Sequence, residues 1–166
     1  MDSIAKEARE ALRYDPETGN LYWRFSRGRF GNSVKAGAKA GCLHRHSGYI
    51  VVRLNGKLLK AHRLAWLLTY GEWPKEHVDH VNCDKGDNRI SNLRAADHTT
   101  NKWNRRKYKS NKSGFKGVSR YRNKWQAAIT ANGTITSLGR FDTPEDAYAA
   151  YCEAAVRLHG DFARVS

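Results

Sequence analysis

HVDHVNCDKGDNRISNLRAADHTTN, residues 77–101, is the part of this 166-residue chain from which its fold and chemistry are best predicted. It contains the neighbouring pair Asp79-His80, a loop rich in Asn, Asp and Gly, and then Asn92 and Asn101. Hydrolysis of a phosphodiester needs an activated water and a cation that holds the phosphoryl and leaving-group oxygens. Asp79 and His80 could meet these two needs, one residue activating the water and the other binding the cation, if their strand ends at this pair. Otherwise neighbouring strand residues point to opposite faces.

The run AHRLAW at residues 61–66, followed by this stretch, resembles the HNH endonucleases of the phage and homing type. The spacing agrees with that family, since Asn92 lies twelve positions after His80 and Asn101 lies nine positions after Asn92. The matched blocks cover roughly residues 49–106. Several blocks in the right order are far more specific than a lone Asp-His pair.

The resemblance implies an α+β fold with N-terminal β-hairpins and a ββα-metal core at about residues 75–106, in which a hairpin packs on a helix around one divalent cation. Carried over by position, His80 is the general base, a task that suits a neutral histidine. Asp79 and Asn101 are the implied ligands of Mg²⁺, or alternatively Mn²⁺, since hard cations prefer oxygen donors. Asn92 holds the loop through hydrogen bonds to the backbone and so orients His80.

The chain departs from the family pattern at several positions. Family members often have Gly in place of Cys83, and Thr and Glu in place of Asp97 and Thr100. Asn101 stands at a position that is His in many members, but an amide oxygen still suits a hard cation. His98, one helical turn before Asn101, is the alternative ligand.

Each of these residues also has an ordinary interpretation. In an arbitrary soluble protein, a pair such as Asp79-His80 is commonly a surface hydrogen bond, and a fold does not by itself imply a function. Asn92 could be a turn residue and Asn101 a helix-surface residue. Because several motifs match the family in the right order, functional roles are favoured for these residues. His62, in contrast, is expected to pack or form a hydrogen bond beneath the site rather than to bind metal.

Local signals predict the elements around this stretch. Asn55-Gly56 is a strong hairpin turn because both central positions of such a turn take positive φ, so we expect paired strands at residues 49–54 and 57–60. Aromatic residues indicate a short strand at 21–25, and leucines at helical spacing indicate a buried helix at 61–70.

The C-terminal third predicts three strands and one helix. The strands are expected at residues 115–120, 124–130 and 134–139. The helix has Thr143 as its N-cap and Gly160 as its stop, and its apolar face is formed by Ala147, Tyr151, Ala154 and Leu158. Residues 113–165 resemble an AP2 DNA-binding domain, which implies a three-stranded sheet laid in the major groove with a helix packed behind it.

The formal charge of +14 is unevenly distributed. Residues 1–60 carry +7, residues 61–101 carry −1, residues 102–124 carry +10 and residues 125–166 carry −2. Such a charge favours nucleic acid as the partner. We therefore predict a nuclease domain at 1–109 and a DNA-binding domain at 110–166, with DNA contacts from Arg105, Arg106, Lys107, Lys109, Lys112, Lys116, Arg120, Arg122, Trp125 and Arg140.

Composition excludes several other classes of protein. No apolar run approaches the ~18–20 residues that span a bilayer, and the polar N-terminus lacks a secretory signal, so we expect a cytoplasmic protein, in a bacterial host if the gene is carried by a phage. The three cysteines, Cys42, Cys83 and Cys152, form no CxxC pair and predict neither disulfides nor structural zinc.

These observations predict a metal-dependent DNA endonuclease that nicks one strand per active site, acts on double-stranded DNA and is a monomer or homodimer. One alternative is a non-catalytic, sequence-specific DNA-binding regulator with an HNH-like structural domain. A second is an RNA-binding protein, which the aromatic content allows although the chain has no recognised RNA motif.

Overall fold

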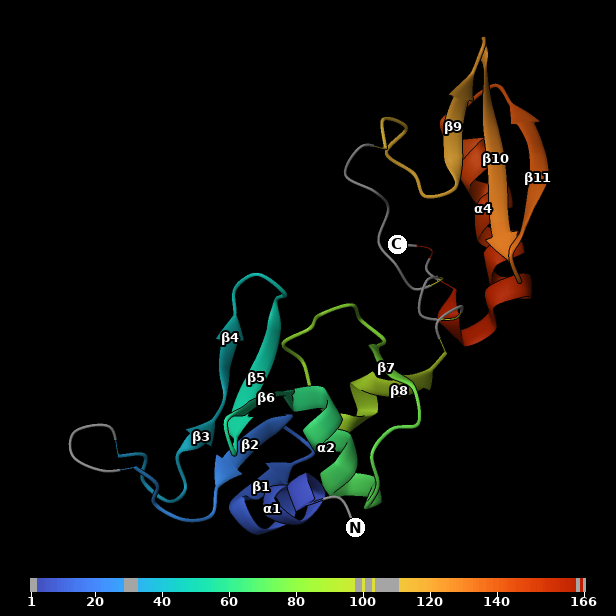
Figure 1. Ribbon diagram of the computed structural model, residues 1–166. Helices are drawn as coiled ribbons and strands as arrows, with labels where there is room; N and C mark the ends of the chain where they lie inside the picture. The colour runs from blue at the N-terminus through green and yellow to red at the C-terminus, as the bar shows by residue number, and fades with distance from the viewer. Residues whose placement is uncertain are drawn as a thin grey trace. The chain divides into compact units, whose positions relative to one another are not determined.

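The computed structural model describes residues 3–28, 33–97, 100, 103, 111–163 and 165. The fold is α+β, as predicted, and consists of small antiparallel sheets and helices (Figure 1). The chain divides into two compact units, residues 1–96 and 97–166. The boundary predicted between residues 109 and 110 lies outside the described residues and stays a prediction. No helix in the described ranges is long and apolar enough to cross a membrane.

Among its described residues, the first unit contains two α-helices, one short 3-10 helix (Ile90–Asn92) and three small sheets. The α-helices are α1 (Ser3–Ala11) and α2 (Ala61–Tyr70). The sheets have the strand orders β1-β2-β3, β4-β5-β6 and β7-β8. The strands are β1 (Leu12–Asp15), β2 (Asn20–Trp23), β3 (Lys39–Ala40), β4 (Cys42–His44), β5 (Tyr49–Leu54), β6 (Lys57–Lys60), β7 (His77–His80) and β8 (Leu93–Ala96).

The predicted hairpin and the helix after it are confirmed. Strands β5 and β6 pair across Asn55 and Gly56, whose φ values of 43° and 74° are those that this two-residue turn requires. Helix α2 begins directly after β6 and ends at Gly71, whose φ of 80° lets its N–H bond to the carbonyl of Leu67. The hairpin therefore leads straight into the helix that supports the candidate site.

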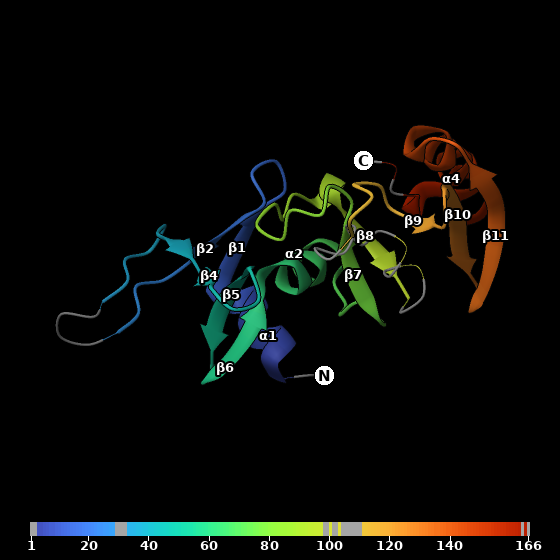
Figure 2. The same ribbon diagram turned by 90° about the horizontal axis from the view of Figure 1, so that it is seen from above.

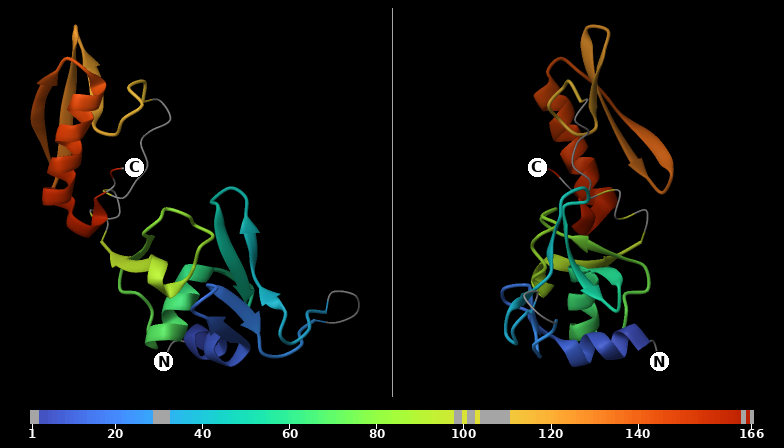
Figure 3. Two further views of the ribbon diagram at one scale, coloured as in Figure 1. Left: turned by 180° about the vertical axis from the view of Figure 1, so that it is seen from behind. Right: turned by 60° about the vertical axis from the view of Figure 1, so that its left-hand side comes forward.

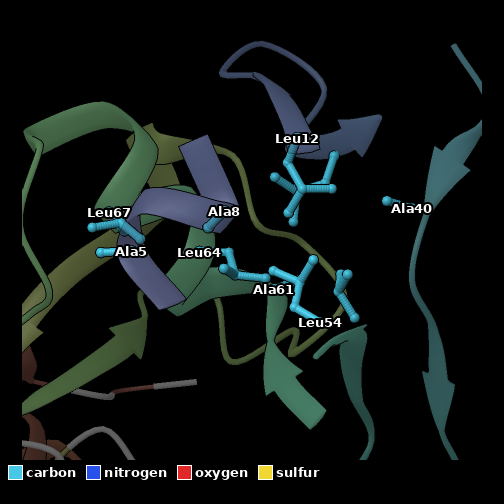
Figure 4. Close-up of a cluster of buried hydrophobic side chains, with 10 residues drawn as sticks. Ala5, Ala8, Leu12, Ala40, Leu54, Ala61, Leu64 and Leu67 are labelled. Carbon is cyan, nitrogen blue, oxygen red and sulfur yellow. The ribbon is translucent and has the colours of Figure 1, made fainter. Parts of the chain in front are cut away.

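The core of the first unit lies between α1, α2 and the strands β1 and β5. Leu12, Leu54, Leu64 and Leu67 are almost fully buried there, and Figure 4 shows them converging from these elements. Helix α1 was not predicted, but it presents only small apolar side chains, Ala5 and Ala8, to this core. In Figure 2, α2 lies between the N-terminal strands and the β7–β8 hairpin.

The second unit contains the three predicted strands and the predicted helix. The sheet has the order β11-β10-β9 and consists of β9 (Val118–Tyr121), β10 (Lys124–Ala131) and β11 (Thr134–Phe141). Helix α4 (Pro144–His159) covers one face of this sheet (Figure 3). The Thr143 hydroxyl accepts a hydrogen bond from the Asp146 N–H at 3.1 Å, which confirms the predicted cap. The likeness to an AP2 domain stays a prediction.

The predicted apolar face of α4 was wrong at its end. Leu158 is 39% exposed, whereas the next residue, His159, is 5% exposed. His159 Nε2 bonds to the Thr130 carbonyl at 3.0 Å, and its ring stacks on Trp103 with centroids 4.5 Å apart. A histidine with a backbone acceptor and an aromatic partner therefore fills the position predicted for a leucine.

Candidate functional site

The candidate site lies where the β7–β8 hairpin meets α2. In the hairpin, Asp79 pairs with Arg94 and His80 pairs with Leu93. Val78 and Leu93 pack against Ala65 of α2, which fixes the hairpin on the helix. Strand β7 ends at His80, as the sequence argument required for Asp79 and His80 to serve one site.

The Asn92 side chain closes the loop between the two strands. Its Oδ1 accepts from the Asn82 N–H at 3.0 Å, and its Nδ2 donates to Asn82 Oδ1 at 3.0 Å and to the Asp87 carbonyl at 2.8 Å. Asp87 is bound in turn by Arg89, whose guanidinium lowers the pKa of the Asp87 carboxyl to about 2. These contacts are of the kind predicted for Asn92, and they fix the loop that follows His80.

The His80 imidazole is buried and oriented by Asn88. It is 4% exposed, and its Nε2 lies 3.1 Å from Asn88 Oδ1. Asn88 Nδ2 donates to the Gly86 carbonyl at 3.3 Å, so Asn88 turns its acceptor oxygen toward the histidine. A neutral His80 then carries its proton on Nε2 and its lone pair on Nδ1. Burial lowers the pKa of His80, which favours this neutral form.

Two aromatic rings pack against His80 from the preceding elements. The His62 ring meets it edge-on at 5.0 Å, and the Tyr49 ring lies 6.0 Å away, all between centroids. His62 is 4% exposed, and burial lowers its pKa to about 3. Within the described ranges its Nδ1 has no hydrogen-bond partner. His62 therefore packs beneath His80 as a neutral ring, as expected.

Asp79 is buried and forms an ion pair with Arg94. Arg94 Nε and Nη2 lie 3.0 and 2.8 Å from Asp79 Oδ2, and Asp79 is 8% exposed. A fixed carboxylate is the donor type that a hard cation prefers. Asn101, the other implied ligand, and His98, its alternative, lie outside the described residues. The part of the chain that the structure describes holds no cluster of three His, Cys, Asp or Glu side chains that could bind a metal ion.

The N-terminal β1–β2 hairpin supports the loop between β7 and β8, a contact that sequence reasoning missed. The Tyr14 hydroxyl donates to the Asn88 carbonyl at 2.8 Å, and burial raises the pKa of that hydroxyl to about 12. Gly19, with φ of 71°, lies so close to the loop that an added Cβ would be 2.4 Å from the Arg89 nitrogen. The residues DPETGN at 15–20 are typical of a turn, but nothing in the sequence indicates that this turn contacts the β7–β8 loop.

In the second unit, the structure places the predicted DNA contacts on two different faces of the sheet. Trp125 packs with Val118 and Ala127 on the side covered by α4. Arg120, directly opposite Trp125 in the sheet, stacks over its ring at 5.0 Å. Strand alternation puts both on the same side as buried Ala127, yet Arg120 is exposed, and the DNA contacts of Trp125 and Arg120 stay a prediction.

The exposed face of the same sheet carries a different set of side chains. Gln126 pairs with Arg140 and Ser119 across the three strands. The Arg140 guanidinium lies 4.1 Å from the Tyr121 ring centroid, and that of Arg122 lies 5.7 Å from it. Tyr121 was not predicted as a contact, although aromatic residues next to arginines are typical of nucleic-acid surfaces.

The remaining predicted contacts are divided between described and undescribed residues. Lys112 is exposed, and Lys116 Nζ donates to the Trp103 carbonyl at 2.5 Å. Arg105, Arg106, Lys107 and Lys109 lie outside the described residues.

Comparison with known proteins shows the family. A family model described as HNH endonuclease matches residues 59–102. The chain is 33% identical over 111 residues to Protein 3.8 of Escherichia phage T7, a match that covers 65% of this chain and 91% of that protein. It is 34% identical over 119 residues to the Uncharacterized HNH endonuclease L560 of Acanthamoeba polyphaga mimivirus, covering 70% of this chain and 62% of that protein. No solved structure gives a significant match. The chain therefore belongs, with viral relatives, to the HNH endonuclease family.

Proposed function

We propose that this protein is a metal-dependent DNA endonuclease in which His80 activates the attacking water. The observation that carries the proposal is the state of His80: a buried, neutral imidazole, held by Asn88 through Nε2, at the end of the strand that also carries Asp79. An ordinary surface histidine has no need of such an environment. The segment lies within the residues that match the HNH endonuclease family model.

In this proposal, different residues transfer the proton and bind the cation. His80 Nδ1 takes a proton from water, while Asn88 keeps the ring in one orientation. Asp79, fixed by Arg94, and Asn101 would hold the divalent cation, Mg²⁺ in our proposal. When bound, that cation supplies electrostatic stabilisation to the phosphoryl and leaving-group oxygens. One such site cuts one strand, so a monomer leaves a nick.

A plasmid-relaxation assay tests this function. We expect the purified protein to convert supercoiled plasmid to the nicked circle with Mg²⁺ and to lose this activity with chelator. Asp79→Asn keeps the shape of the side chain but removes its charge, and should abolish nicking while the variant still binds DNA. The opposite outcome is a wild-type protein that binds DNA but leaves the plasmid intact with either Mg²⁺ or Mn²⁺, even when the plasmid carries candidate native sites. That outcome would support the non-catalytic regulator.

We also propose that the second unit is the DNA-binding module that positions the enzyme. The exposed face with Tyr121, Gln126 and Arg140 supports this role, since cations and an aromatic ring lie together on it. Arg140→Gln is expected to weaken DNA binding about eightfold at 0.1 M salt and to reduce the salt slope by about 1. Arg157→Gln, which removes the same charge from the last turn of α4, is the matched control. Equal affinities of the two variants in a titration with labelled duplex would contradict this role.

A further inference from the structure

Two lysines from separate parts of the sequence lie over one aromatic ring beside His80. Lys60 ends β6, and Lys85 lies in the loop between β7 and β8. Their Nζ atoms are 4.4 and 4.7 Å from the centroid of the Tyr49 ring. Neither lysine belongs to the predicted set of DNA contacts.

The structure holds Lys85 in this position from two directions. Its Nζ donates to the Ser47 carbonyl at 2.8 Å, and its Cδ lies 3.6 Å from the place where a Cβ on Gly48 would be. The turn after β4 and the loop after β7 are thereby joined, and Figures 1 and 3 show them side by side.

The arrangement brings two positive charges to one ring, and the Asp79 carboxylate, which is paired with Arg94, is the negative charge that acts on that ring. In the described part of the chain, neither Lys60 nor Lys85 forms an ion pair, although both approach the same ring. Helix α2 starts directly after Lys60 without a side-chain cap, and so adds the positive end of its dipole. Both ammonium groups therefore lie close to the Tyr49 ring, and a phosphate bound beside that ring would be stabilised by their positive charge.

The position of the Tyr49 ring and its two lysines beside His80 indicates which anion they would bind. The Tyr49 ring that carries both lysines is 6.0 Å from the His80 ring, between centroids. We propose that Lys60 and Lys85, supported by Tyr49, bind a backbone phosphate of the DNA strand next to the phosphodiester that His80 cleaves. This subsite rests on the proposed endonuclease function, and it adds Lys60 of β6 and Lys85 of the β7–β8 loop to the residues that would bind the substrate.

Binding measurements on a non-cleaving background test the subsite. In the full-length His80→Ala protein, the double change Lys60→Gln and Lys85→Gln should weaken binding to duplex DNA about 60-fold at 0.1 M salt and lower the salt slope by about 2, since each phosphate contact contributes about 0.9. Lys57→Gln, at the other end of β6, is the matched control and should change neither value. Lys60→Arg with Lys85→Arg should restore binding, because both charges are kept, and thermal unfolding of every variant checks the fold.

Cleavage assays separate this inference from the function on which it rests. In the otherwise wild-type protein, the double Gln variant should raise KM with little change in kcat. If wild type nicks DNA but the double variant keeps the wild-type KM and salt slope, the subsite is wrong while the nuclease stands. If no DNA is cut but the slope falls by about 2, the nuclease proposal fails while the phosphate contacts remain. Tighter binding of duplex RNA than of duplex DNA would overturn DNA as the occupant.

Discussion

His80→Ala is expected to lower kcat for DNA nicking by about 10²- to 10⁴-fold, the usual contribution of a general base. The reason is geometric: Asn88 accepts a hydrogen bond from Nε2 of the neutral ring, which puts the lone pair on Nδ1, the nitrogen that we propose takes a proton from water. DNA affinity should remain that of wild type, because the imidazole is buried and adds no charge when neutral. Single-turnover nicking and a separate binding titration measure the two effects.

The control for this experiment is a histidine on the same strand. His77→Ala removes an exposed imidazole three residues before His80 and should leave nicking close to wild type. The acid limb of kcat/KM in wild type should lie below pH 6.5, because burial lowers the pKa of His80 and the base works only when unprotonated. Equal losses in the His77 and His80 variants, or full activity of His80→Ala, would remove His80 from the mechanism.

Gly19→Ala is expected to destabilise the protein by roughly 2–5 kcal/mol and to reduce nicking strongly. The new Cβ would lie 2.4 Å from the Arg89 nitrogen and 2.6 Å from the Asn88 carbonyl carbon. Both are backbone atoms, so no rotamer change relieves the clash, and overpacking of this kind costs about 1–3 kcal/mol. The φ of 71° adds about 1–2 kcal/mol for a residue with a side chain. The loop must then shift, and Asn88 moves away from His80.

Gly37→Ala separates the cost of the positive φ from the cost of the steric clash. Gly37 has φ of 79°, but nothing lies within 4 Å of the position of its Cβ, so only about 1–2 kcal/mol is expected. Urea unfolding measures the free energy of unfolding of both variants, and nicking rates under native conditions measure their activity. If Gly19→Ala loses no more stability than Gly37→Ala, the N-terminal hairpin does not brace the loop.

Elements that depend on short-range signals were predictable from the sequence. The turn at Asn55 and Gly56 and the capped helix that begins after Thr143 are set by residues within a few positions of each other. Their backbone preferences and hydrogen bonds act locally, so tertiary packing did not alter them. Helix α1 has only two small alanines in the core, and so gave too weak a pattern to predict.

The support of the site could not be predicted, because it depends on contacts between distant residues. Tyr14 and Asn88 are 74 positions apart, and neither carries a local signature of their hydrogen bond. Asp79 and His80 were identified by a motif, whereas Asn88 and Tyr49 act through geometry that only the folded chain creates. The face of the sheet on which Trp125 lies could not be predicted for a related reason, since an aromatic residue in a small sheet suits either face until the helix covers one.

The stacking of Trp103 on His159 limits where the nuclease and C-terminal units of such proteins can be joined by recombination. Lys116 also holds the Trp103 carbonyl, so a residue from the end of the nuclease motif is packed into the C-terminal unit. A gene fusion joined at residue 110 would separate Trp103 from both partners and leave His159 without its aromatic neighbour. A junction after residue 96 keeps the whole cluster in one donor, but it also takes Asn101, the proposed metal ligand, from that donor, so a working chimera needs both parents to match at this position.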